Sequence, residues 1–201
     1  MMTALVAVYL WALSTGRERW EWLIKPAAAL TFIATALFQG ALSTDWGTAL
    51  FVGLLFAAGG DILLIPKDRR AFLGGLVSFL IGHLGYAVAF GIRGLDLVAV
   101  GMASVGLVAV GVPIMRWLWP HVEGPMRGPV LGYVLVITAM VALSIGTFAA
   151  HGNGLLVLGA VGFYFSDLAV ARQRFVSEAL ANRLWGLPLY FYSQLILASA
   201  V

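Results

Sequence analysis

Two aspartates lie inside long apolar stretches of the sequence. Asp61 is the single charged residue between Leu50 and Ile65, and Asp167 lies in a second apolar stretch much later in the chain. A carboxylate at membrane depth costs about 2.5–3.5 kcal/mol on insertion scales, so it usually faces the protein interior and serves a function. Two carboxyl groups in different surroundings can divide the roles of general acid and general base between them. We therefore predict that Asp61 and Asp167 form a catalytic acid–base pair.

Four further polar side chains fall at a similar depth. His83 and Tyr86 are three residues apart, and Tyr190 and Gln194 are four apart, so each pair shares one face of a helix. Counted from the nearest basic loop at about 1.5 Å per residue, Tyr190 lies in the same half of the membrane as the aspartates, and His83 lies deeper on a helix that enters from the same side. We expect these side chains and the two aspartates to meet in one polar pocket.

Structural explanations remain open for each of these residues. An aspartate near a helix end could pair with Arg69 or Arg172 in the following loop, and His83 or Gln194 could join neighbouring helices by hydrogen bonds. Ser166 beside an aspartate does not make a serine-hydrolase site, because the Gly-x-Ser-x-Gly motif is missing. A zinc site would need a histidine together with both aspartates, and no closely spaced pair of histidines supports it.

The composition indicates an integral membrane protein. Of the 201 residues, 62% are hydrophobic and 10% are charged, whereas soluble domains carry about 25% charged residues. The net charge of +3 does not indicate binding to nucleic acid, because the basic residues stand in short breaks between apolar segments. The absence of cysteine excludes disulfides and thiolate chemistry. We predict an all-α, polytopic membrane helix bundle that forms a single transmembrane domain over residues 1–201.

The apolar segments predict the number of membrane crossings. A helix needs about 20 apolar residues to cross the hydrocarbon core, and the sequence offers eight candidate segments, the first of them short. The breaks between them are only a few residues long, which leaves no room for a soluble domain. We therefore expect about eight transmembrane helices. Their predicted ranges are Met1–Ser14, Pro26–Leu42, Trp46–Ile65, Ala71–Ile92, Leu95–Met115, Pro129–Ala150, Gly154–Ala171 and Leu184–Val201.

The basic residues predict the orientation in the membrane. Eleven of the twelve lysines and arginines fall at odd-numbered loops, and Arg93 is the exception. By the positive-inside rule these loops are cytoplasmic in the cell (inner) membrane, and both termini then lie on the outer side. Met1–Ser14 lacks the basic start of a cleavable signal peptide, so none is expected.

Small residues and a repeat pattern bear on how these helices pack. We expect glycine pairs such as Gly82 with Gly85 and Gly101 with Gly106 to bring helices close together. The third and seventh segments each carry an aspartate before a basic loop, and the fourth and eighth each carry polar groups after it. This pattern suggests a parallel repeat of four helices plus four.

Four short motifs are spread over nearly the whole chain. They are Gly60-Asp61 followed by Leu63 and Leu64, Phe79 with Gly82-His83 and Tyr86, Gly159 with Phe163 and Ser166-Asp167, and Tyr190 with Gln194. In this order and spacing they resemble the YhhN-type lysoplasmalogenase family, whose eight transmembrane helices also agree with the predicted segments. The resemblance implies hydrolysis of the vinyl ether bond of a lysoplasmalogen, which gives a fatty aldehyde and glycerophosphoethanolamine or glycerophosphocholine.

The implied reaction fits these residues. Vinyl ether hydrolysis begins with protonation of the carbon β to the ether oxygen, and water then adds to the resulting oxocarbenium ion. The resemblance implies that Asp61 and Asp167 supply the acid and the base in an order left open, and that His83 orients or relays the proton. It implies a lysophospholipid substrate among membrane lipids and requires no metal or organic cofactor. The expected substrate-binding residues are Tyr86, Tyr190, Gln194 and Ser166, and the basic Lys67, Arg69 and Arg172 could meet the phosphate.

Other functions remain compatible with the sequence. Membrane carboxylates and a histidine serve proton relays equally well, so a small proton-coupled transporter or lipid carrier is the main alternative. A metal-dependent lipid hydrolase would use His83 with the two aspartates, and a non-enzymatic membrane scaffold would use none of them. The gathering of polar groups at one depth argues against transport, which needs a polar path through the whole membrane.

Overall fold

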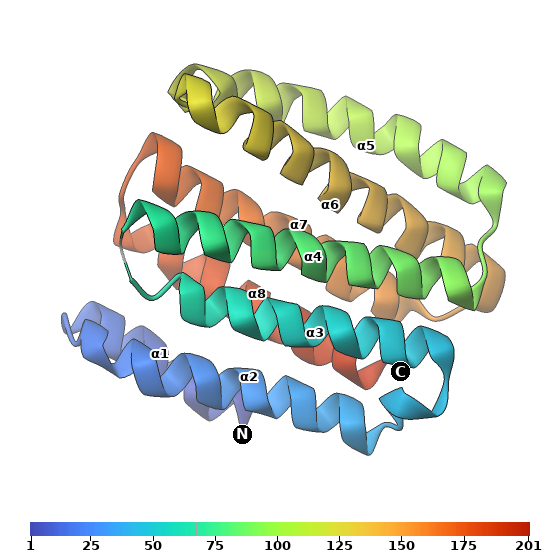
Figure 1. Cartoon of the computed structure of the whole chain (residues 1–201), viewed down its shortest axis with the longest axis horizontal. Coiled ribbons are helices and arrows are strands. Elements are labelled where there is room, and N and C mark those ends of the chain that lie inside the picture. The colour runs from blue at the N-terminus through green and yellow to red at the C-terminus, as the bar shows by residue number, and fades with distance from the viewer. Residues whose placement is uncertain (67) are drawn as a thin grey trace.

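A computed structural model describes residues 1–66 and 68–201 as a bundle of antiparallel helices (Figure 1). Within that part of the chain there are eight α-helices and no strand, which confirms the all-α prediction. Lys67, one of the expected phosphate ligands, lies outside the described residues. The helices are α1 (Met2–Ser14), α2 (Glu21–Phe38), α3 (Asp45–Leu63), α4 (Arg69–Arg93), α5 (Leu97–Leu118), α6 (Gly124–His151), α7 (Gly154–Ala171) and α8 (Leu180–Ser199).

Six helices of the described part, α2 to α7, are long and apolar enough to cross a membrane. The helix α1 has only 13 residues, which is below the usual minimum of about 17. The helix α8 carries polar residues along its length, such as Asn182 and Gln194. The structure confirms a polytopic helical bundle, while membrane crossing by α1 and α8 stays a prediction.

Three helices begin several residues earlier than the apolar pattern predicts. They are α2, which begins at Glu21, α6, which begins at Gly124, and α8, which begins at Leu180. Charged residues end an apolar stretch without ending a helix, because backbone hydrogen bonding does not depend on hydropathy. The helix α2 also ends early, at Phe38, where the chain turns through Gly40 with a φ of 84°. The earlier start of α2 brings charged side chains into the bundle.

The closest helix packing occurs within the α3–α4 and α7–α8 hairpins. A Cβ atom on Gly82 would lie 3.1 Å from the carbonyl oxygen of Gly53, and one on Gly85 would lie 3.0 Å from the Cα of Gly53. These two glycines therefore let α4 approach α3 closely, as expected. The expectation for Gly101 and Gly106 is wrong, because a Cβ on either would meet nothing within 4 Å in the described part of the chain. Both lie on α5, which runs along the edge of the bundle (Figure 1).

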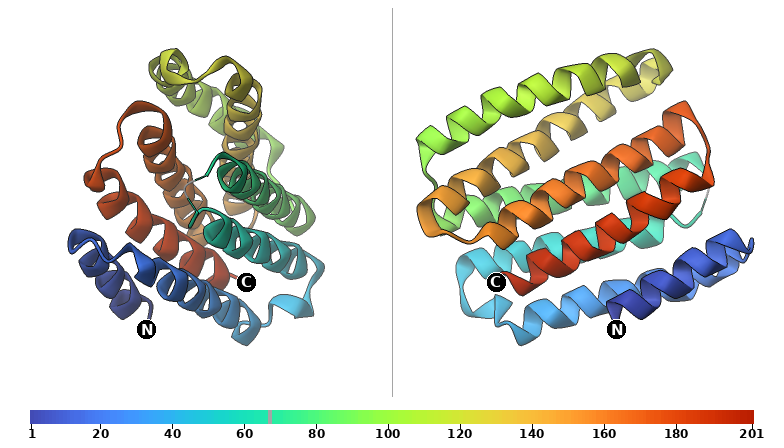
Figure 2. Two further views of the ribbon diagram at one scale, coloured as in Figure 1. Left: turned by 60° about the vertical axis from the view of Figure 1, so that its left-hand side comes forward. Right: turned by 180° about the vertical axis from the view of Figure 1, so that it is seen from behind.

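The helices pack in two similar groups. The helix α2 packs against α3 and α8, and α6 packs against α7 and α4. Figure 2 shows α1 and α2 at one edge and α5 and α6 at the opposite edge, with the two hairpins between them. The contacts of α2, α3 and α4 thus correspond to those of α6, α7 and α8, as a four-plus-four repeat requires. This arrangement brings the ends of α3 and α7 that carry the aspartates to the same end of the bundle (Figure 1).

Replacement of Gly85 by leucine should weaken the bundle, because the new side chain would collide with the backbone of α3. Over-packing of this kind costs about 1–3 kcal/mol. The matched Gly106→Leu variant should leave stability unchanged, since its side chain would extend into open space at α5. Thermal unfolding of both purified variants in detergent measures the difference. Equal melting temperatures for the two variants would show that α3 and α4 are not closely packed.

Candidate active site

A large cavity lies near the end of the bundle where the α3–α4 and α7–α8 connections run, at the left in Figure 1. Its volume is about 670 Å³, which falls in the range of small-molecule binding sites. All eight helices contribute to its wall. Four of the seven predicted site residues face this one space, namely Asp61, Ser166, Asp167 and Tyr190.

Asp61 lies near the C-terminal end of α3 and is 3% exposed. Its Oδ2 accepts a hydrogen bond of 2.7 Å from the Tyr190 hydroxyl of α8. The Nζ of Lys25, on α2, donates a 3.3 Å hydrogen bond to the Asp61 backbone carbonyl and so brings a positive charge beside the carboxyl group. The neighbouring Gly60 leaves room for the Phe79 ring of α4, since a Cβ at position 60 would lie 2.7 Å from that ring. Asp61 is therefore held where α2, α3, α4 and α8 meet.

Asp167 lies near the C-terminal end of α7 and has different partners. Its Oδ2 accepts a 2.6 Å hydrogen bond from the Tyr133 hydroxyl of α6. The Nε2 of His83, on α4, lies 3.2 Å from the same oxygen. The side chain of Asp167 is 16% exposed and lines the cavity. The two aspartates thus share one cavity with different neighbours, which is the condition for different protonation roles.

The contacts of His83 indicate where the site can hold a proton. Its Nδ1 lies 2.6 Å from the carbonyl oxygen of Phe79, which can only accept, so Nδ1 carries a hydrogen. In a neutral ring Nε2 is then an acceptor, and it has no aligned hydrogen bond within the described residues. It faces an Asp167 oxygen at 3.2 Å, and two acceptors at that distance attract each other only when one of them binds a proton. The His83–Asp167 pair is therefore suited to hold a proton.

Phe163 packs between the partners of the two aspartates. Its ring centroid lies 4.3 Å from that of His83 and 5.3 Å from that of Tyr190. The side chain is fully buried. Because one rigid ring contacts a partner of each aspartate, it fixes the spacing between the two carboxyl groups.

Three predicted site residues lie behind the cavity wall. The Tyr86 hydroxyl donates a 2.6 Å hydrogen bond to Oε1 of Gln194, and both side chains are fully buried. Neither they nor His83 belong to the described lining of the cavity. His83 reaches the cavity only through its aspartate, whereas Tyr86 and Gln194 join α4 to α8. Ser166 does line the cavity, but its hydroxyl donates to the Phe163 carbonyl oxygen at 2.7 Å.

Two further expectations concern ligands. No group of three or more His, Asp or Glu side chains in the described part of the chain is arranged to hold a metal ion. Arg69 and Arg172 are not among the described lining residues, and Arg172 instead donates a 2.8 Å hydrogen bond to Asn182. A phosphate inside the cavity would therefore meet other cations.

Sequence reasoning missed a charged group beside Asp61, here called the mouth cluster and formed by Glu18, Glu21, Lys25 and Arg183, all of which line the cavity. The assignment of Glu21 and Lys25 to a loop is wrong, because both lie in α2 and are 7% and 6% exposed. Glu21 pairs with Arg183 of α8, and its carboxylate lies 4.0 Å from Nζ of Lys25. The available signal was the four-residue spacing of Glu21 and Lys25, which places both on one helix face.

Tyr133 is the second omission. It is the only tyrosine in the sixth apolar segment of the sequence, and its hydroxyl donates to Asp167. A tyrosine hydroxyl inside an apolar helix needs a hydrogen-bond partner, and that need was the signal for a polar neighbour.

Comparison with known proteins places this site in a family. A sequence model of the YhhN family matches residues 20–201, which include both aspartates and all their partners. "Lysoplasmalogenase TMEM86A" of Bos taurus is 31% identical over 183 residues, covering 88% of this chain and 71% of that protein. "Lysoplasmalogenase" of Mycobacterium tuberculosis is 34% identical over 147 residues, covering 68% of this chain and 54% of that protein. No solved structure matches the chain significantly. The chain therefore belongs to the YhhN family.

Proposed function

We propose that the protein is a membrane-bound lysoplasmalogenase. It hydrolyses the vinyl ether bond of a lysophospholipid and releases a fatty aldehyde with glycerophosphoethanolamine or glycerophosphocholine. The names of the relatives support this activity. The observation that carries the mechanism is that two carboxyl groups face one cavity with different hydrogen-bond partners. The scheme uses only side chains and water.

Asp167 acts as the general acid. Its contact with His83 is favourable only when the pair holds a proton, and the Tyr133 hydroxyl fixes the orientation of the carboxyl group. Asp167 gives this proton to the carbon β to the ether oxygen. The electron pair of the carbon–carbon double bond forms the new C–H bond, and the positive charge is shared by the adjacent carbon and the ether oxygen.

Asp61 acts as the carboxylate of the pair. The Tyr190 hydroxyl and the nearby Lys25 stabilise its negative charge, and that charge stabilises the oxocarbenium ion. Water adds to the charged carbon while Asp61 takes one of its protons. The hemiacetal then collapses as the ether C–O bond breaks. The departing glycerol oxygen takes the proton from Asp61, and the hemiacetal hydroxyl returns a proton to Asp167, which restores both groups.

The apolar part of the cavity suits the alkenyl chain. Side chains of α4, α5 and α6 line it, among them Leu76, Ile114, Leu118, Val130 and Ile137. The helix α5 packs mainly on α6, and most of its apolar surface is exposed, as expected for contact with lipid. A chain in this part of the cavity would place its vinyl ether at the aspartates. In the proposed orientation the basic loops are cytoplasmic, so the cavity opens toward the cytoplasmic leaflet.

The rate of aldehyde release should be about 100-fold lower, or lower still, in the Asp61→Asn and Asp167→Asn variants, because each lacks one proton-transfer group. Asp45→Asn is the matched control, since Asp45 lies exposed in the first turn of α3 and outside the described cavity lining. A coupled assay that reduces the aldehyde with NADH measures the rate on purified protein with lysoplasmalogen. Full activity in both site variants would refute the proposed chemistry.

The His83→Gln variant should lower kcat by about 10- to 100-fold and leave KM nearly unchanged, because His83 contacts Asp167 but not the cavity. Its solvent deuterium isotope effect on kcat should be at least as large as that of the unmodified protein, since proton transfer to carbon then limits the rate. His151→Gln serves as control, because His151 lies exposed at the opposite end of the bundle. A change in KM alone would contradict the role given to His83.

A further inference from the structure

The mouth cluster has an order of charges that the hydrolysis chemistry does not explain. Lys25 lies deepest, beside Asp61, and Glu21 stands about one helical turn closer to the start of α2. Glu18 precedes α2 and is the outermost member, with a side chain that is 49% exposed. Arg183 of α8 joins the two glutamates, pairing with Glu21 and lying 3.5 Å from Glu18. A ligand that extends outward from Asp61 would therefore meet Lys25 first, the Glu21–Arg183 ion pair next and the accessible carboxylate of Glu18 last.

The two cations have donors to spare. An ammonium group carries three donors. In the described residues Nζ of Lys25 contacts the Asp61 carbonyl at 3.3 Å and the Glu21 carboxylate at 4.0 Å, and the second distance is too long for a direct hydrogen bond. Arg183 has five donors, of which its two glutamates use only some. A buried cation such as Lys25 and a half-buried one such as Arg183 favour an anionic ligand oxygen.

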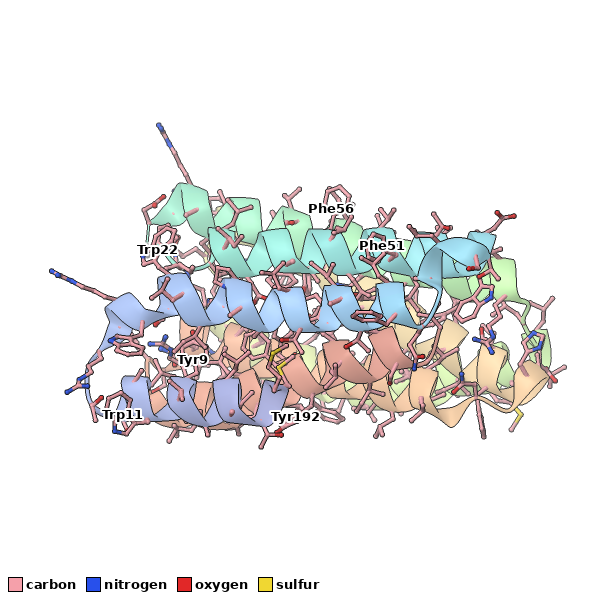
Figure 3. The ribbon with its side chains drawn as sticks, turned by 90° about the horizontal axis from the view of Figure 1, so that it is seen from below. Tyr9, Trp11, Trp22, Phe51, Phe56 and Tyr192 are labelled. Atoms are coloured by element: carbon pink, nitrogen blue, oxygen red, sulfur yellow. The ribbon has the colours of Figure 1, made fainter. Side chains whose placement is uncertain are left out.

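The hydroxyl of Tyr9 adds an observation next to the mouth cluster. Tyr9 is 1% exposed, lies on the inner side of α1 and lines the cavity (Figure 3). Its hydroxyl lies close to Arg183 and Glu21 but makes no aligned hydrogen bond within the described part of the chain. A buried hydroxyl whose contact with Arg183 is poorly aligned is not fully satisfied, so a polar ligand atom at this position would stabilise the site.

On the basis of the proposed lysophospholipid substrate, we propose that the mouth cluster is the head-group subsite. Lys25, Arg183 and the Tyr9 hydroxyl bind the phosphate, and Glu18 binds the amine of a phosphoethanolamine head group. The order of charges outward from Asp61 then matches the order of vinyl ether, phosphate and amine along the lipid. The site selects lysophospholipids whose head group carries both a phosphate and an amine.

Binding of saturated 1-O-alkyl ether analogues tests the subsite without turnover, because they lack the vinyl group that is hydrolysed. Three analogues with the same alkyl chain are compared: the glycerophosphoethanolamine, the glycerophosphate and the alkylglycerol without phosphate. Dissociation constants are measured in detergent by competition with a fluorescent lysophospholipid. The phosphoethanolamine should bind most tightly and the alkylglycerol most weakly.

Two variants separate the phosphate and amine contacts. The Lys25→Met variant should raise the dissociation constants of both phosphate-bearing analogues by about tenfold or more and leave that of the alkylglycerol unchanged. The Glu18→Gln variant should raise the dissociation constant of the phosphoethanolamine analogue alone. The increase should be no more than about fivefold, because Glu18 is partly exposed to solvent. Because Glu18 is at the surface, its variant keeps the test valid even if Lys25→Met does not fold. The controls are Arg116→Gln and Glu123→Gln, which remove exposed charges outside the described cavity lining.

The outcomes distinguish this inference from the proposed activity. If Glu18→Gln and Lys25→Met change the binding of all three analogues equally, or change none, the head-group subsite is overturned even when the protein releases aldehyde. If head-group-dependent binding follows the expected pattern but no aldehyde forms from lysoplasmalogen, the subsite stands and the proposed hydrolysis fails.

Discussion

A carboxyl group buried in an apolar bundle is costly unless hydrogen-bond donors replace the water it has lost. Both aspartates of this site obtain such a donor from a helix outside their own hairpin: Asp61 of α3 from Tyr190 of α8, and Asp167 of α7 from Tyr133 of α6. The site therefore exists only when both hairpins and α6 are correctly docked. Close contacts through glycine hold the two helices of each hairpin together, and the ring of Phe163 sets the spacing between the hairpins.

The two halves of the bundle supply equivalent positions with different chemistry. Asp61 has Tyr190 of α8 and Lys25 of α2 beside it, whereas Asp167 has His83 of α4 and Tyr133 of α6. In the four-plus-four correspondence, α8 matches α4 and α2 matches α6. In the proposed mechanism, the cation beside one carboxyl group and the histidine beside the other give the two groups different protonation states, so that two like residues divide the acid and base roles.

Much of this organisation could be predicted from the sequence. Long apolar segments with short breaks predicted the helical bundle. The isolation of Asp61 and Asp167 in such segments predicted that the two carboxyl groups belong to one site. Depth along the helix could not show which way Tyr86 and Gln194 face, and these residues turn out to bind each other. The mouth cluster was missed because charged residues at a span end are normally explained by topology. Their pairing depends on the packing of α2 against α8, which a single sequence does not reveal.

In the proposed mechanism, a carboxyl group in the cavity delivers a solvent-exchangeable proton to carbon. Hydrolysis of lysoplasmalogen in D2O, with the aldehyde reduced to the alcohol as it forms, tests this most directly by mass spectrometry. Proton transfer of this kind places one deuterium on the carbon next to the aldehyde carbon in every product molecule. An aldehyde formed without deuterium at that carbon would contradict it.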